Sequence, residues 1–325
     1  MRFFFINIPL SLILFLISCS NNINKDIKFK RFDIDLYNTI NNIDTSYQTR
    51  LTEDYPALFE LYYSGILGGT DNNTNYYDKL NYIKEIISVD NFNNLYNTVL
   101  SEFSDLDKEE TILSKSIFNF YKLFPNYYFP EIYTHISPFG YSIITSDSLI
   151  SVSLDNYLGE NFSGYNGFYH KYQLPKRNRD RIVTDIFKGW IYANFNNSFI
   201  KNIADGMIYE GAVIYAIKEI VPNCNEGQII GYNKEQIEWL EKNEEWVWNS
   251  IINSNHLYST NTLLYSKYMN EAPFCALLGQ DVPAEVGKWI GFKIISKYIN
   301  NTGIDILETI LKGNIPTVEI LKYYN

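Results

Sequence analysis

The chain has 325 residues, of which 46% are hydrophobic and 20% are charged, and its net charge is −10. This hydrophobic content excludes an intrinsically disordered protein, because a core of that size offsets the entropy lost on ordering the chain. The negative charge argues against nucleic-acid binding, since the phosphate backbone would repel the protein. The aromatic content, with 28 Tyr and 21 Phe, fits either codon bias or an aromatic surface that binds sugars.

The N-terminus has the pattern of a secretion signal. Arg2 precedes three phenylalanines and an apolar run at residues 8–17. This run is the only long apolar one in the chain, which argues against a protein with several membrane spans. It is also too short to cross a bilayer, so residues 1–18 are predicted to be a signal peptide.

The predicted signal peptide ends in LISC, and Cys19 is the predicted lipidation site. This ending resembles a bacterial lipobox, in which the cysteine receives a diacylglycerol and, after cleavage, a further acyl chain such as palmitate. Several acyl chains on one residue give stable anchoring, whereas one chain is marginal. An ordinary signal peptide with a chance cysteine is the alternative. Position 20 is Ser and not the Asp that would favour the inner membrane, so the outer membrane is favoured, and the protein is expected on the periplasmic face.

The rest of the chain is predicted to be a short tether and one domain. Residues 19–30 are polar, and residues 31–325 contain no internal repeat and no low-complexity linker. A single globular domain is the simplest interpretation of this part. Within it, Cys224 and Cys275 either form one disulfide or remain buried thiols.

The first half of the domain is predicted to contain helices and then a small sheet. Apolar residues at i, i+3/i+4 and i+7 predict helices at 76–88 and 109–124. Residues 131–137, 141–146 and 149–154 are short runs of β-branched and aromatic residues separated by turn signals. They predict two or three antiparallel strands.

The second half is predicted to be almost entirely helical. Asn233 and Gln236 are placed to form a capping box at the start of one of its helices. The predicted fold class is therefore α+β, predominantly helical, with a small antiparallel sheet. The helices are expected at residues 176–194, 199–220, 233–253, 260–269, 285–298 and 305–311.

A Gly- and Tyr-rich loop at residues 161–172 separates the strands from these helices. Its Tyr165, Tyr169 and Tyr172 are the candidate aromatic side chains for binding a glycan or a protein partner. The basic residues 176–181 that follow form either a solvated face or a contact for a partner or a phosphate. The GxxxG at 287–291 predicts close packing between two helices.

Common catalytic and metal-binding motifs are absent from the sequence. There is no HExxH, no GxSxG, no nucleotide-binding glycine loop and no EF-hand loop. His135, His170 and His256 are far apart in sequence, so no two of them can form a zinc site on one helix. The sequence therefore predicts no cofactor, no metal and no enzymatic activity.

The order of elements is nevertheless similar to that of gluzincin-type zinc peptidases. In those enzymes, HExxH lies on a first helix and a glutamate on the next helix completes the metal site. In this sequence Thr184 and Lys188 stand at the histidine positions, Asp185 at the general-base position, and Glu210 on the next helix. Lys188 paired with Glu210 would make a closed relic of a metal site in a degenerate zincin-like domain. The alternative is that all four are ordinary polar positions on partly exposed helices.

Several motifs occur in a fixed order along nearly the whole chain. They are the lipobox, FDID at 32–35, YSGIL at 63–67, SLDNYLG at 153–159, MIYEG at 207–211, GY at 231–232 leading into EW at 238–239, NEAPF at 270–274 and GKWIG at 287–291. Together they resemble the gliding-motility lipoprotein B (GldB) family of the Bacteroidetes. The resemblance implies an envelope lipoprotein required for movement over surfaces, and it carries no catalytic residues onto this chain.

We therefore expect a lipid-anchored envelope protein that acts without catalysis, through contacts with other motility or secretion proteins. Anchoring would raise its effective concentration near membrane partners. Two alternatives remain open. One is a glycan-binding lipoprotein that uses the loop at 161–172, and the other is a metallopeptidase with a site that the motifs do not reveal.

Overall fold

The computed structural model describes residues 26–41, 51–70 and 74–324. The predicted signal peptide, Cys19 and the first part of the tether lie outside the described residues. Before the sheet, the helices are α1 (Phe32–Asn41), α3 (Pro56–Glu60), α4 (Tyr76–Ile87), α5 (Asp90–Glu102) and α6 (Asp107–Leu123). After it come α7 (Ile182–Asn194), α8 (Ile203–Ile220), α9 (Glu226–Ile230), α10 (Lys234–Asn253), α11 (Thr262–Met269), α12 (Val286–Thr302), α13 (Leu307–Leu311) and α14 (Thr317–Leu321).

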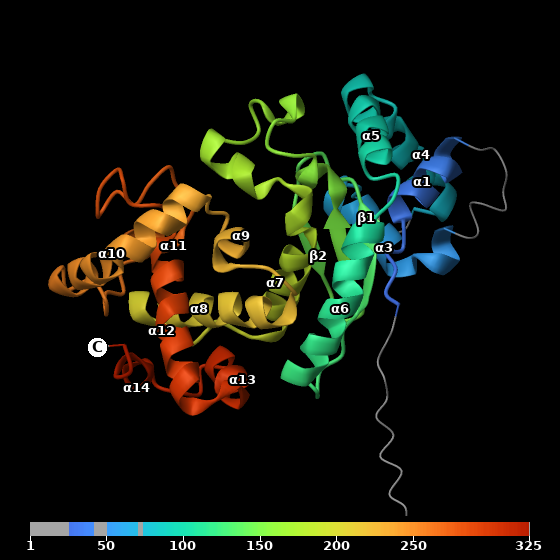
Figure 1. Ribbon diagram of the computed structural model, residues 1–325. Coiled ribbons are helices and arrows are strands. Elements are labelled where there is room, and N and C mark those ends of the chain that lie inside the picture. The colour runs from blue at the N-terminus through green and yellow to red at the C-terminus, as the bar shows by residue number, and fades with distance from the viewer. Residues whose placement is uncertain (1–25, 42–50, 71–73, 325) are drawn as a thin grey trace, which may run out of the picture.

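The helices lie around a small central sheet, with α1, α4 and α5 on one side and α8, α10 and α12 on the other (Figure 1). The sheet consists of β1 (Glu131–His135), β2 (Ile143–Thr145) and β3 (Leu149–Ser153). Buried side chains from both sides of the sheet belong to one hydrophobic cluster. The predominantly helical α+β class is thus confirmed.

The sheet is mixed, so the prediction of a wholly antiparallel sheet is wrong for one pair of strands. Its order is β1-β3-β2, in which β3 is antiparallel to β2 but parallel to β1. Burial explains the order, because all five residues of β3 are buried whereas those of β2 are partly exposed. The most apolar environment, the centre of the sheet, is therefore occupied by the last strand.

Each of the helices predicted from apolar periodicity is present, with shifted ends. The predicted capping box of α10 is confirmed, since the Asn233 side chain accepts from the Gln236 amide and Gln236 reaches back to the Asn233 amide. Helices α1, α3, α5, α9 and α14 were not predicted. In α5 the buried Phe92, Leu95 and Val99 have helical spacing, but asparagines of low helix propensity obscure it.

The segment before α7 differs from the prediction. A continuous helix was expected from residue 176, but α7 begins at Ile182 after two 3₁₀ turns, η4 (Lys171–Lys176) and η5 (Arg179–Arg181). Asn178 between them is extended, with φ −98° and ψ 144°, which interrupts the helix. The basic residues 176–181 therefore lie on irregular turns that lead into α7.

The central helix is α8, and α12 crosses it (Figure 1). At the crossing, Gly211 of α8 faces Gly291 of α12 so closely that a Cβ on either residue would overlap the backbone of the other helix. The predicted role of the GxxxG is thus confirmed. Direct contact of two helix backbones requires glycine at both positions, because any side chain would separate the helices.

Replacing Gly291 with Ala should destabilise the protein by about 3 kcal/mol or more, since the new methyl group would overlap the Met207 carbonyl, which is backbone and cannot move aside. Chemical denaturation followed by circular dichroism measures this. The matched control is Gly65→Ala in the π-helical turn η1 (Leu61–Ile66), where an added Cβ meets only the Leu61 side chain. Equal stability of the two variants would contradict the proposed backbone contact.

Candidate functional site

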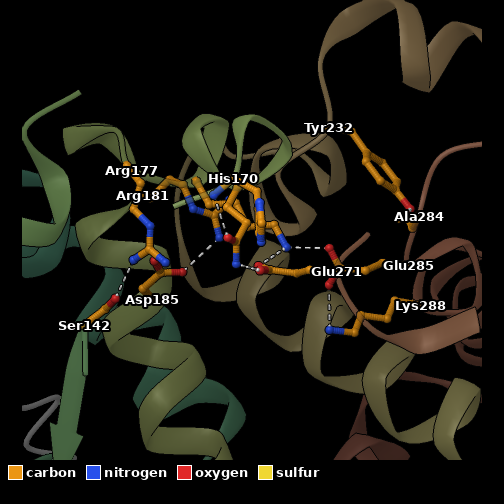
Figure 2. Close-up of polar contacts among 12 residues, drawn as sticks. Ser142, His170, Arg177, Arg181, Asp185, Tyr232, Glu271, Ala284, Glu285 and Lys288 are labelled. Carbon is orange, nitrogen blue, oxygen red and sulfur yellow. Dashed lines mark hydrogen bonds and ion pairs between the residues drawn. The ribbon is translucent and has the colours of Figure 1, made fainter. Parts of the chain in front are cut away.

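A polar cleft of about 550 Å³ lies between the turns that precede α7 and the N-terminal end of α12. Figure 2 shows how side chains from these segments point toward one another. Its volume is within the range of small-molecule sites, but its lining is far more polar than usual for them. The lining residues are Ser142, Tyr172, Gln173, Lys176, Arg177, Arg181, Asp185, Lys188, Asn270, Glu271, Glu285 and Lys288.

Glu285 lines the cleft on the α12 side. It is only 5% exposed and has a left-handed backbone with φ 60°, which is uncommon for a non-glycine residue. Its carboxylate forms ion pairs with Lys176 and, at 2.8 Å, with Lys288. Burial opposes ionisation of Glu285, but Lys288, Lys176 and Lys188 outweigh burial and lower its pKa to about 2. The carboxylate is therefore charged at neutral pH.

Three further contacts stabilise this side of the cleft. Lys176 also pairs with Glu271 at 2.7 Å, and the same carboxylate accepts a hydrogen bond of 3.0 Å from the Gln173 amide. Burial alone would raise the pKa of Glu271, but Lys176 outweighs it and the pKa is lowered. The Tyr232 hydroxyl donates to the Ala284 carbonyl at 2.6 Å, which holds the residue before Glu285 in place. The ion pair between Lys176 and Glu285 thus connects the turn η4 to the start of α12.

On the opposite wall, Arg181 is 4% exposed and pairs with Asp185 at 3.0 Å. Its guanidinium also donates to the carbonyls of Gln228 and Ile229. The Asp185 carboxylate accepts a further hydrogen bond, at 3.1 Å, from the Tyr157 hydroxyl. The Nε atom of Arg181 is buried and has no hydrogen-bond partner among the described residues.

Arg177 is held without a carboxylate. One of its guanidinium nitrogens donates to Ser142 Oγ and to Asn156 Oδ1, both at 3.0 Å, and its planar group lies 3.9 Å from the centre of the Tyr169 ring. Within the described part of the chain, its buried Nε has no hydrogen-bond partner either. This cation is positioned by neutral groups, so its charge is not compensated locally.

Lys188 is the second uncompensated cation. Its ammonium lies 5.8 Å from the Tyr192 ring, and no carboxylate of the described residues forms an ion pair with it. Burial is the main cause that lowers the pKa of Lys188 to about 8, and the like charge of Lys288 adds to it, against the attraction of Glu210 and Asp185. A lysine held in this way destabilises the fold and is typical of a functional position.

The four positions predicted as a relic metal site are only partly brought together. Asp185 and Lys188 line the cleft, but Thr184 points into the core, 1% exposed, and its hydroxyl donates to the Arg181 carbonyl. Glu210 is not among the residues that line the cleft; it accepts a hydrogen bond from the Tyr192 hydroxyl at 2.8 Å and approaches Lys288 at 3.8 Å. The expected Lys188–Glu210 ion pair is therefore replaced by a Lys288–Glu210 contact.

The three tyrosines of the predicted loop have different surroundings in the structure. Tyr165 is 1% exposed, and its hydroxyl donates to the Asp155 carbonyl and accepts from the Leu158 amide, so it belongs to the core. This burial removes Tyr165 from any binding surface. Tyr169 lies beneath Arg177, and only Tyr172 lines the cleft, stacked on His170 with an angle of 10° between the rings.

The remaining histidines and the cysteines lie elsewhere. His135 is buried in β1, bonded to Ser151 at 2.7 Å, and burial lowers its pKa to about 3, while His256 bonds Tyr268 at 3.0 Å. Cys224 and Cys275 are free thiols. Residues 26–41, 51–70 and 74–324 contain no group of three or more His, Cys, Asp or Glu side chains that could hold a metal ion. In the same ranges, no helix is long and apolar enough to cross a membrane.

The main residues that sequence reasoning missed are Glu285, Glu271 and Lys288. Their only sequence signal was their place in or beside the motifs NEAPF and GKWIG. The second of these motifs was interpreted only through its glycines, although its lysine lies in the cleft. Glu285 lies outside both motifs. Its role could not be predicted from neighbouring residues, because it depends on a contact with Lys176, which is 109 residues away in sequence.

Comparison with known families gives a match that covers nearly the whole chain. Residues 17–323 match a family described as "Gliding motility protein GldB", whose label also marks it as a lipoprotein family. The match includes Cys19, the last residue of the predicted lipobox, and every residue that lines the cleft. Searches of curated proteins and of solved structures returned no match.

Lys188→Met should raise the free energy of unfolding at pH 7 by about 2 kcal/mol, because it removes a cation whose pKa is lowered to about 8 and keeps the apolar stem. In the wild type this penalty is complete below pH 8 and disappears as the pH rises toward 10.5. The gain should therefore vanish in alkaline solution. Denaturation at several pH values measures it, with the exposed Lys171→Met as control. Destabilisation by Lys188→Met at pH 7 would contradict this account.

Glu285→Gln should lower the free energy of unfolding at pH 7 by about 3 kcal/mol, because two partly buried lysines lose the buried carboxylate that they share. The folded pKa lies near 2, below the unfolded value of 4.5, so the wild-type advantage is complete above pH 4.5 and is lost as the pH falls toward 2. Thermal melts from pH 2 to 7 test this. The control is Glu235→Gln on the exposed start of α10, and a pH-independent difference would count against the ion pairs.

Proposed function

Because the chain belongs to the GldB family of gliding motility proteins, we propose that it is a lipid-anchored envelope component of the gliding machinery. In this proposal it acts without catalysis, by contacting other motility or secretion proteins. The observation that carries the proposal is the extent of the family match, which begins within the predicted signal peptide and ends two residues before the end of the chain. The motility-linked lipoprotein character comes from the family, and the mode of action is our inference.

The anchor is proposed to be Cys19. Cleavage after residue 18 would leave Cys19 as the first residue, with a tether at 19–30 and a globular domain at 31–325. Acyl chains on that residue would hold the domain at a membrane surface, where diffusion in two dimensions raises its concentration near partners. Ser20, in place of an Asp, supports the outer membrane over the inner one, and we propose that the domain faces the periplasm.

The charge arrangement of the cleft supports a role without metal catalysis. At the positions where a gluzincin-type peptidase would hold its ion, this chain has the ammonium of Lys188, and the ammonium of Lys288 lies against Glu210. Two cations repel a divalent metal, and a glutamate already facing an ammonium is a poorer metal ligand. These charges therefore oppose metal binding at the proposed relic of a metal site.

An apolar groove supports contact with other proteins. It has a volume of about 730 Å³, lies between α5 and the loop around Phe162, and contains no charged side chain. Val89 and Phe168 at its rim are 61% and 64% exposed. Apolar side chains exposed together are typical of protein interaction sites.

A second candidate function is glycan binding. Tyr172 lines the charged cleft together with the amides of Gln173 and Asn270, which suits a polar, hydroxyl-bearing ligand. In this alternative Tyr169 serves as a support for Arg177. Tyr165 has only a structural role in it.

Cys19→Ala should move the protein from the membrane fraction to the soluble fraction and abolish colony spreading, because it removes the acylated thiol. Fractionation with immunoblotting and a spreading assay in the native host measure both effects. The matched control is Cys224→Ala, which removes a partly buried free thiol from the globular part.

Full spreading by a soluble Cys19→Ala protein would contradict the anchoring proposal. Stoichiometric zinc in the purified protein, together with peptide cleavage, would contradict the proposal that it acts without catalysis.

A further inference from the structure

The cleft contains two cations for which the described residues supply no anionic partner. In a chain of net charge −10, cations are normally matched by carboxylates, and the other cations of the cleft are matched in this way. Arg177 contacts only neutral hydrogen-bond acceptors and an aromatic ring. Lys188 lies near an aromatic ring, and Glu210 and Asp185 attract it without forming an ion pair with it in the described structure. Both line the same cavity.

Burying a cation without a counter-ion costs free energy, which the fold must offset elsewhere. The lowered pKa of Lys188 is a measure of this cost. The Nε atoms of Arg177 and Arg181 add two buried donors that, in the described structure, bond to nothing. Unpaired donors next to uncompensated positive charge are what a site for a missing anion would contain.

We propose that this cleft binds the oxyanion group, a phosphate or a carboxylate, of a small polar ligand, and that Arg177 and Lys188 are its principal contacts. This inference goes beyond the proposed function and does not depend on lipid anchoring or on motility. A free ion and an acidic sugar share this chemistry, and the experiment below separates them.

The carboxylates of the cleft do not prevent an oxyanion from binding. Asp185 is paired with Arg181, Glu271 with Lys176, and Glu285 with both Lys176 and Lys288. With these pairs formed, the charge left over in the cleft is positive. An incoming oxyanion would meet Arg177, already oriented by Ser142 and Asn156, so little side-chain entropy would be lost on binding.

The size and the neutral lining indicate a ligand larger than a bare ion. A volume of about 550 Å³ exceeds what one phosphate fills, and Tyr172, Gln173 and Asn270 add a ring and two amides around the charged centre. Groups of this kind suit the hydroxyls of a sugar. An acidic sugar would therefore use more of the cleft than inorganic phosphate does.

The test is isothermal titration calorimetry on the full lipoprotein in neutral detergent, at pH 7 and low salt. Inorganic phosphate, glucuronate and uncharged glucose are titrated separately. We expect saturable binding of phosphate and glucuronate and none of glucose. Arg177→Gln and Lys188→Met should each weaken binding at least about tenfold, since each removes a charge-assisted contact. Lys171→Met, which removes an exposed lysine outside the lining, should leave binding unchanged.

Tighter binding of glucuronate than of phosphate would support the site and identify an acidic sugar as the ligand, whereas equal binding would support the site with a free oxyanion. Lys188→Met is expected to be more stable than the wild type, so its loss of binding cannot be attributed to unfolding. Absence of saturable binding of either anion by folded protein would overturn the proposal. Unchanged affinity in both Arg177→Gln and Lys188→Met would overturn it as well.

Discussion

The contact between the backbones of α8 and α12 at Gly211 and Gly291 is the constraint on which the C-terminal half of the molecule depends. Helix α8 is buried along most of its length and packs on α6, α7, α11 and α13 as well as on α12. At these glycines its backbone lies directly against that of α12. A core built around one such crossing tolerates changes of side chain more readily than changes of helix spacing.

The same crossing determines where the charges of the cleft lie. Lys288 is three residues before Gly291 on α12, and Glu210 is the residue before Gly211 on α8, so the crossing brings this lysine and this glutamate to 3.8 Å. Glu285 then reaches across to Lys176 on the turn before α7. The cleft is thus assembled from helices fixed by packing and from one irregular segment fixed by ion pairs. Arg177, on the irregular segment, and Lys188, on α7, both line this cleft.

Features that depend on local sequence were predictable, and features that depend on distant contacts were not. The capping box at Asn233 and the helix-packing role of the GxxxG follow from neighbouring residues, and both are present. The start of α7 was missed because 3₁₀ turns have no apolar period of their own. The strand order depends on which strand gains most from burial, and the partner of Glu285 is 109 residues away. Neither can be derived from spacing along the chain.

The closeness of the α8–α12 crossing also restricts how this family can diversify. A helix that is locked through its backbone cannot slide or rotate to suit a new ligand, so the cleft can change only through the side chains that line it. Substitutions at Gly211 and Gly291 should be strongly non-additive, since the first change already separates the helices and leaves room for the second. In evolutionary terms, the two glycines form an epistatic pair, because the cost of changing either one depends on whether the other has already changed.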